Sequence, residues 1–130
     1  MQGDLSKSRD IIESPDDRRA RIYRRIDIEL DLIGMRAKLK GRSYLREAIY
    51  VQIHSEKERG SGIEEVAIME KKAYQSIAKA MQTAINDAWD RADMEDVYTH
   101  FTARITSKTG VPYVSDFIHF YSDKIKNTLD

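Results

Sequence analysis

The stretch from Ile63 to Arg91 contains neither glycine nor proline, and it favours a helical architecture over any other. Within it, apolar residues recur every three or four positions, which is the period of an α-helix: Ile77, Met81, Ala84, Ile85, Ala88 and Trp89. No convincing alternation of apolar and polar residues indicates a strand elsewhere. The sequence therefore predicts an all-α fold, and a length of 130 residues suits one domain.

Local signals predict where the other helices begin and end. Ser14 to Asp17 combines a capping serine, a proline at the first helical position and two acids that favour a helix start. Gly34 is a suitable end for this first helix. We expect a basic connector over residues 35–42, a second helix capped by Ser43, and a Gly60–Gly62 turn after it. Further helices are expected at Met94–Phe101 and from Val114, with a loop from Thr102 to Tyr113 between them.

Two points of organisation stay at the level of expectation. Residues 1–13 show no periodicity and are predicted to be a flexible tail, which leaves residues 14–130 as the domain. The segment from Ile63 to Arg91 can be one long helix or two helices joined near Glu70–Lys72, and periodicity alone cannot distinguish these alternatives.

Composition excludes several classes of function. The chain has no cysteine, so disulfides, thiolate catalysis and cysteine metal sites are excluded. No apolar run reaches the roughly 20 residues that span a bilayer, and the first residues do not resemble a secretion signal, which predicts a cytoplasmic protein. The net charge is zero, but residues 18–59 carry 12 bases and 6 acids and can therefore supply phosphate contacts.

The segment from Glu65 to Gln82 has the pattern of a helix-turn-helix, in which the second helix enters the major groove of DNA. Ala67 is the small residue wanted where the two helices cross, and Val66 and Ile77 are the packing residues. The turn itself is atypical, since it has no glycine or asparagine and Lys72–Ala73 offers no capping hydroxyl. The alternative, an ordinary amphipathic helix with a solvated face, stays open on this segment alone.

Polar residues on the second helix form the candidate DNA-reading face. Amide side chains can pair with adenine, and a lysine can reach guanine or a phosphate. The candidates for base contacts are Gln75, Ser76, Lys79 and Gln82, and the candidates for phosphate contacts are Lys71, Lys72 and Lys108.

The run KGRSYLREAI, from Lys40 to Ile49, resembles the segment that opens the second helix in the C-terminal DNA-binding effector domain of the sporulation-initiation response regulator, stage-zero sporulation protein A. The similarity extends over about residues 20 to 126. Supporting positions are Ile33-Gly34, Ala84-Ile85, Ala88-Trp89, Phe101, Pro112, Phe117-Ile118 and Asp123-Lys124.

The resemblance implies a six-helix bundle that contains a helix-turn-helix. Its first motif helix would cover about residues 63–69, and its recognition helix about residues 73–91. It also implies binding to short boxes of double-stranded DNA, as a homodimer or a tandem dimer, to regulate transcription. No cofactor is implied.

Three departures from the family pattern suggest an alternative. The segment between Gly62 and Val66 is about four residues shorter than the family pattern. The family's recognition helix carries arginines and a glutamate, where this one offers residues such as Gln75 and Lys79. No receiver domain is expected before the effector. The alternative is a protein-interaction module that dimerises with a full-length regulator, with DNA binding weak or lost.

Enzymatic and metal-binding functions find little support in the sequence. The three histidines, His54, His100 and His119, are far apart, and none has a partner at the spacing of metal ligands. No nucleophile, glycine-rich loop or oxyanion motif accompanies the carboxylates. We therefore expect no catalytic residues and no metal site. A membrane-surface role for the basic first helix is disfavoured by its interspersed acids Asp27, Glu29 and Asp31.

Overall fold

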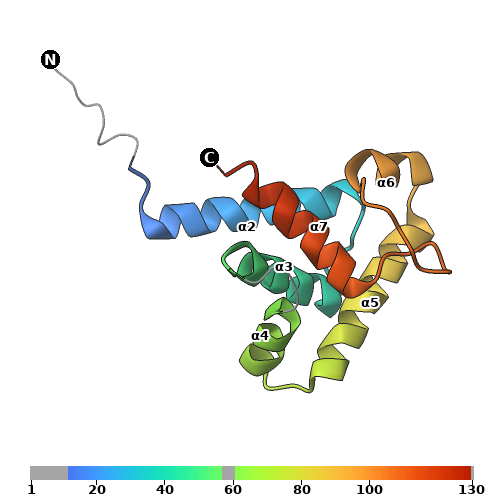
Figure 1. Cartoon of the computed structure of the whole chain (residues 1–130), viewed down its shortest axis with the longest axis horizontal. Helices are drawn as coiled ribbons and strands as arrows, with labels where there is room; N and C mark the ends of the chain where they lie inside the picture. The colour runs from blue at the N-terminus through green and yellow to red at the C-terminus, as the bar shows by residue number, and fades with distance from the viewer. Residues whose placement is uncertain (1–11, 57–60, 130) are drawn as a thin grey trace, which may run out of the picture.

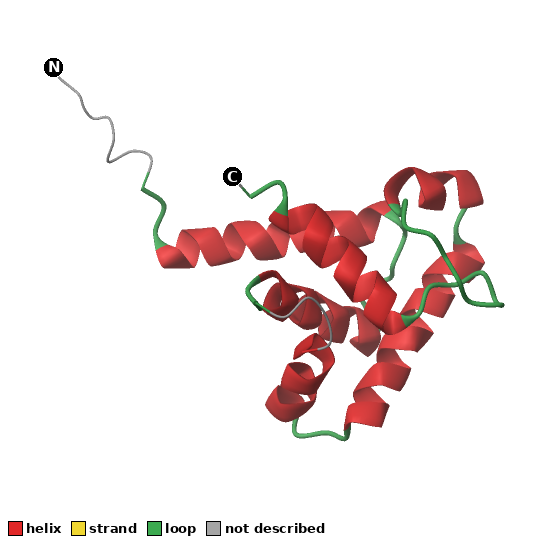
Figure 2. Cartoon of the chain, in the orientation of Figure 1, coloured by secondary structure: helices red, strands yellow, loops and turns green. Residues whose placement is uncertain are grey.

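The computed structural model describes residues 12–56 and 61–129, and these residues form six α-helices and no β-strand (Figure 2). The all-α, six-helix prediction is confirmed. The predicted flexible tail lies outside the described residues except for residues 12 and 13. The helices, labelled in Figure 1, are α2 (Pro15–Leu32), α3 (Lys40–Ile53), α4 (Ser61–Glu70), α5 (Tyr74–Arg91), α6 (Met94–His100) and α7 (Val114–Lys126).

Both ends of α2 follow the predicted local signals. The Ser14 hydroxyl accepts a hydrogen bond from the Asp17 backbone N–H at 3.1 Å, and Pro15 occupies the first turn. At the other end, Gly34 adopts φ 74°, in the left-handed region that glycine tolerates best. The N–H groups of Gly34 and Met35 then bond to the carbonyls of Asp31 and Leu30, which closes the helix with a Schellman motif.

The predicted start of the second helix was wrong by four residues. Helix α3 begins at Lys40 with Leu39 as its cap, and Ser43 lies exposed inside the helix instead of capping it. The reason is tertiary, because Gly41 lies in the first turn of α3 directly against α5. A Cβ atom at Gly41 would lie 2.0 Å from the Ala80 carbonyl oxygen, so only glycine allows the two backbones this approach.

The predicted turn at Gly60–Gly62 was also wrong at Ser61 and Gly62, the two of its residues that the structure describes. Ser61 and Gly62 belong to α4, while Gly60 lies outside the described residues. A Cβ atom at Gly62 would lie 2.7 Å from the Ala48 carbonyl oxygen. This glycine therefore serves the close packing of α4 on α3 and does not interrupt the helix.

Helix α3 lies at the centre of the bundle, with α2, α4, α5 and α7 packed around it (Figure 1). Its side chains Leu45, Ala48 and Ile49 are fully buried. An aromatic cluster completes the core between α5, α6 and α7, and its members are Trp89, Phe101, Phe117 and Tyr121. The apolar stripe predicted for α5 forms the side of that helix that faces this core.

None of the described helices combines the length and the apolar character needed to cross a bilayer. No group of three or more histidines and acids in these ranges is placed to hold a metal ion.

Candidate nucleic-acid interface

The stretch from Ile63 to Arg91 forms two helices, α4 and α5, which project together at one end of the bundle (Figure 1). Lys71 makes the turn between them by adopting φ 56°, the backbone conformation usually given to glycine. The N–H groups of Lys71 and Lys72 bond to the carbonyls of Ile68 and Ala67 at 3.2 and 3.0 Å. Helix α4 therefore ends in the same Schellman motif as α2, with a lysine in place of glycine.

The inner side of this helix pair matches the prediction from the sequence. Val66 and Ile77 are fully buried, and Ala67 is 8% exposed. Helices α4 and α5 pack on each other and both pack on α3. One side of the pair therefore packs against α3 at the centre of the bundle, and the other side is accessible to solvent or to a ligand.

The first two turns of α5 present a polar outer surface. Gln75, Ser76 and Lys79 are exposed there, and Tyr74 is 47% exposed at the first helical position. We call the exposed side chains Tyr74, Gln75, Ser76 and Lys79 the α5 outer face. Ala73, the N-cap residue of α5, has no side chain that can accept a hydrogen bond from the first turn of the helix.

Gln82, the fourth residue predicted to contact bases, is in a different environment. It is half-buried, and its side-chain nitrogen donates to the Pro112 carbonyl oxygen and to Asn86 Oδ1, both at 3.1 Å. This amide group therefore links the middle of α5 to the loop before α7.

The three lysines predicted to contact phosphates do not lie together. Lys71 and Lys72 lie in the turn before α5, and both are exposed. Lys108 lies in the turn of residues 107–110, and the next residues along this loop line a hollow with the second half of α5 and with α6. Lys108 is thus beside the far half of α5, away from Lys71 and Lys72.

Lys72 is held by a residue of the KGRSYLREAI run. Its Nζ donates a hydrogen bond to the Tyr44 hydroxyl at 3.1 Å and lies 5.8 Å from the centre of the Tyr44 ring. The hydrogen bond to Tyr44 raises the pKa of the Lys72 ammonium group. Lys72 therefore keeps its charge at neutral pH while Tyr44, on α3, restrains its position.

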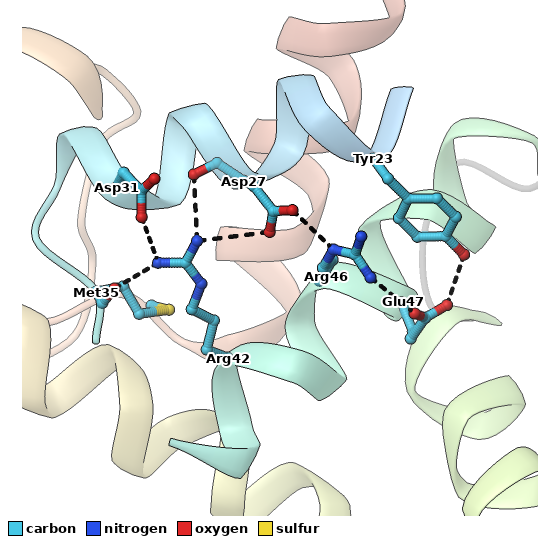
Figure 3. Close-up of polar contacts among 7 residues, drawn as sticks. All are labelled: Tyr23, Asp27, Asp31, Met35, Arg42, Arg46 and Glu47. Atoms are coloured by element: carbon cyan, nitrogen blue, oxygen red, sulfur yellow. Dashed lines mark hydrogen bonds and ion pairs between the residues drawn. The ribbon is translucent and has the colours of Figure 1, made fainter. Parts of the chain in front are cut away.

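Other residues of the same run fasten α3 to α2, as Figure 3 shows. The Arg42 guanidinium, 6% exposed, donates to the Met35 carbonyl oxygen at 2.5 Å, to Asp31 at 2.7 Å and to the Asp27 carbonyl oxygen at 3.3 Å. Arg46 donates to Asp27 at 3.1 Å. A fourth contact joins Arg42 to the Asp27 carboxylate at 3.5 Å, and together these bonds close the connector between α2 and α3 around a buried cation.

Tyr23 of α2 completes this contact with α3. Its hydroxyl donates to Glu47 at 2.6 Å, and its ring stacks on Tyr50 with 4.3 Å between ring centres. The Arg46 guanidinium lies 4.2 Å from the centre of the Tyr23 ring. Burial and the bond to Glu47 together raise the pKa of Tyr23 to about 12, so this hydroxyl remains a donor at neutral pH.

Helix α7 is fastened to α2 by a second buried ion pair. The Glu29 carboxylate, 4% exposed, accepts from Lys124 at 2.8 Å and from the Arg25 guanidinium at 3.0 and 3.1 Å. Burial alone would raise the pKa of Glu29, but the bonds from Lys124 and Arg25 outweigh it and lower the pKa. Glu29 therefore stays ionised inside the bundle.

The sequence did not single out two residues at or next to this candidate interface. Tyr74 was not selected as a candidate, although the Ala73–Tyr74 boundary could have marked it as the first outward residue of α5. Tyr44 was named only as part of the run that resembles the family, and no contact was predicted for it. Its hydrogen bond to Lys72 joins residues 28 positions apart, which no local pattern in the sequence indicates.

The family model described as sporulation initiation factor Spo0A C terminal matches residues 26–125. The match covers α3, α4, α5 and α6 entirely and α7 almost to its end. No solved structure matches the chain.

Proposed function

The chain belongs to the family of Spo0A C-terminal domains, and on this premise we propose that it binds double-stranded DNA in a sequence-specific way to regulate transcription. The family is that of the DNA-binding domain of a sporulation regulator and is not an enzyme family. The resemblance identified from the KGRSYLREAI run is therefore confirmed. A cytoplasmic location is part of the same proposal.

The observation that carries the proposal is the projecting α4–α5 pair with its exposed polar face and its braced interior. In a helix-turn-helix, the N-terminal residues of the second helix contact base edges. The exposure of Gln75, Ser76 and Lys79 in the first two turns of α5 supports assigning them this role. Lys71 and Lys72 contact the phosphates beside them, where the positive end of the α5 dipole adds to the attraction.

The other two predicted contacts depend on further conditions. Gln82 contacts a base only if its amide exchanges the Pro112 carbonyl oxygen for a base edge. Lys108 contacts a phosphate only if the DNA extends along α5 as far as the loop of residues 107–110. Gln82 and Lys108 therefore remain in the proposal as contacts with DNA that lies beyond the first two turns of α5.

The proposal is tested by selecting DNA from a random pool and measuring affinity for the enriched site over a range of salt. We expect the logarithm of the affinity to fall with the logarithm of salt concentration, with a slope of about −0.9 for each phosphate contact. Lys79→Ala and Gln75→Ala should each weaken binding to the selected site by about 1 to 3 kcal/mol.

Lys126→Ala is the matched control, because Lys126 is an exposed lysine on α7, at the opposite side of the bundle from the α4–α5 turn (Figure 1). It should leave the affinity close to that of the unmodified protein. The assignment of the reading face is wrong if Lys79→Ala and Gln75→Ala bind the selected site as tightly as this control.

A second candidate function, a protein-interaction module that pairs with its own copy or with a full-length regulator, is favoured by one observation. Ile68 and Met69 are 70% and 52% exposed at the end of α4. Light scattering on the purified protein, alone and mixed with a full-length regulator, tests this candidate. A monomer at high concentration that forms no mixed dimer and binds DNA by itself would exclude it.

A further inference from the structure

We infer that the α5 outer face reads adenine and thymine in preference to guanine and cytosine, so that the DNA site of this chain is A·T-rich where α5 contacts it. This inference rests on the proposed function. It adds the class of base pairs to be recognised, which follows from the side chains that the structure exposes.

The first step concerns guanine, for which the commonest specific reader is an arginine or lysine bonded to O6 and N7. Between Tyr74 and Asp90, helix α5 carries no arginine. Arg91, at the end of the helix, donates to the Gly34 carbonyl oxygen at 3.1 Å and lies 3.6 Å from Asp87. This guanidinium is thus bound to the scaffold, and Lys79 is the one side chain of the α5 outer face that can bond to guanine, in the second turn of the helix behind Tyr74 and Gln75.

The second step concerns adenine, whose N6 and N7 are matched by an amide that donates and accepts at once. Gln75 is exposed in the first turn of α5, on the side opposite the buried Ile77. Gln82, about two helical turns further along, is held by Pro112 and Asn86. Gln75 is therefore the amide of the α5 outer face that is placed for adenine.

The third step concerns thymine, whose methyl group is recognised by apolar contact in the major groove. Tyr74, 47% exposed beside Gln75, presents an aromatic ring at the end of α5 that enters the groove first. The first two turns of α5 cover about 11 Å, or roughly three base pairs. Adenine and thymine are thus matched by adjacent side chains within one short segment of DNA.

The test is selection from a random pool, followed by affinity measurement on each single-base variant of the enriched site. We expect at least one adenine whose replacement by guanine weakens binding by about five- to 150-fold, and we expect Gln75→Ala to abolish this difference. Gln75→Arg should convert the preference at the same position from adenine to guanine. Asn127→Ala, an exposed amide at the end of α7, is the matched control and should leave every base preference unchanged.

The possible failures are distinguishable. A selected site dominated by G·C pairs, or a Gln75→Ala variant with an unchanged base profile on a tightly bound site, would overturn the inference while leaving DNA binding in place. A pool that shows no enrichment and no salt-dependent binding would overturn the proposed function and the inference together. Circular dichroism of each variant separates a lost contact from a lost fold.

Discussion

Lys71 occupies a backbone conformation that costs a residue with a side chain about 1 to 2 kcal/mol compared with the usual helical region. Its φ of 56° closes α4, and the two hydrogen bonds of the Schellman motif depend on it. We therefore expect Lys71→Gly to raise the free energy of unfolding by about 0.5 to 1 kcal/mol, measured by urea denaturation.

Lys71→Ala is the control for the loss of charge, because alanine removes the ammonium group and keeps the backbone strain. It should leave stability nearly unchanged, and both variants should lower DNA affinity by the same amount if Lys71 contacts a phosphate. Equal stability of the glycine and alanine variants would show that the turn is not strained at this position.

Arg42 is a buried charged side chain at the contact between α2 and α3. It satisfies the Met35 carbonyl oxygen from a buried position and reaches two acids of α2. We expect Arg42→Ala to lower the free energy of unfolding by about 2 to 4 kcal/mol, because a buried acceptor loses its partner. Arg42→Lys should recover less than half of this loss, since one ammonium group cannot replace the planar fork. Full recovery by lysine in thermal unfolding would contradict this account.

Among the elements, the contact between α3 and α5 depends on Gly41. A side chain at this position would collide with the backbone of Ala80 and lie 2.9 Å from the Ala84 Cβ. We expect Gly41→Ala to destabilise the fold by more than about 3 kcal/mol, because neither helix can move away without disturbing the core.

Gly110→Ala provides the comparison for this prediction. Gly110 has φ 77°, but no atom lies within 4 Å of the place its Cβ would take. Its replacement should cost only about 1 kcal/mol from backbone strain. Similar losses for the two variants in chemical denaturation would mean that the helices separate easily.

The elements also show which parts of the fold the sequence could predict. The start of α2 was predicted correctly because Ser14, Pro15 and the following acids act within one turn of the chain. The start of α3 was not, because the cap was predicted at Ser43 after a connector over residues 35–42, whereas Gly41 lies in the first turn of the helix and contacts Ala80, far along the chain. The break between α4 and α5 was likewise unresolved, since a lysine there takes the role for which glycine is the usual signal.

In the candidate site, too, local features could be predicted from the sequence and contacts between distant segments could not. Helical spacing was sufficient to place Gln75, Ser76 and Lys79 on an exposed surface and Val66 and Ile77 behind it. Spacing could not show that Gln82 donates to Pro112, 30 positions away, or that Lys108 lies beside the other half of α5. Contacts between distant segments depend on how the helices cross, which a periodic pattern does not report.

At the scale of the whole molecule, ionised groups join helices that are distant in sequence. Glu29 of α2 is bonded to Lys124 of α7, and the pKa of Glu29 is lowered in the folded state. The unfolded chain therefore binds more protons in acid, so this contribution to stability is present above the ordinary glutamate pKa of 4.5 and is lost as pH falls through the folded pKa.

We expect the unmodified protein to lose stability steeply below about pH 4.5, and Glu29→Gln to be less stable at pH 7 with a shallower acid dependence. Urea unfolding at several values between pH 3 and pH 7 measures both effects. Glu64→Gln, at an exposed position on α4, is the matched control. Parallel pH profiles for the Glu29→Gln variant and the unmodified protein would contradict the role given to this ion pair.

The residues of the KGRSYLREAI run make contacts that hold the helices of the bundle together. Gly41 admits α5, Arg42 and Arg46 bind α2, and Tyr44 steadies the lysine before α5. A protein that contains the same run is therefore expected to share this scaffold, and the run carries no information about the DNA sequence that the proposed reading face selects. Under the proposed function, two such proteins in one cell keep a common frame and regulate separate genes.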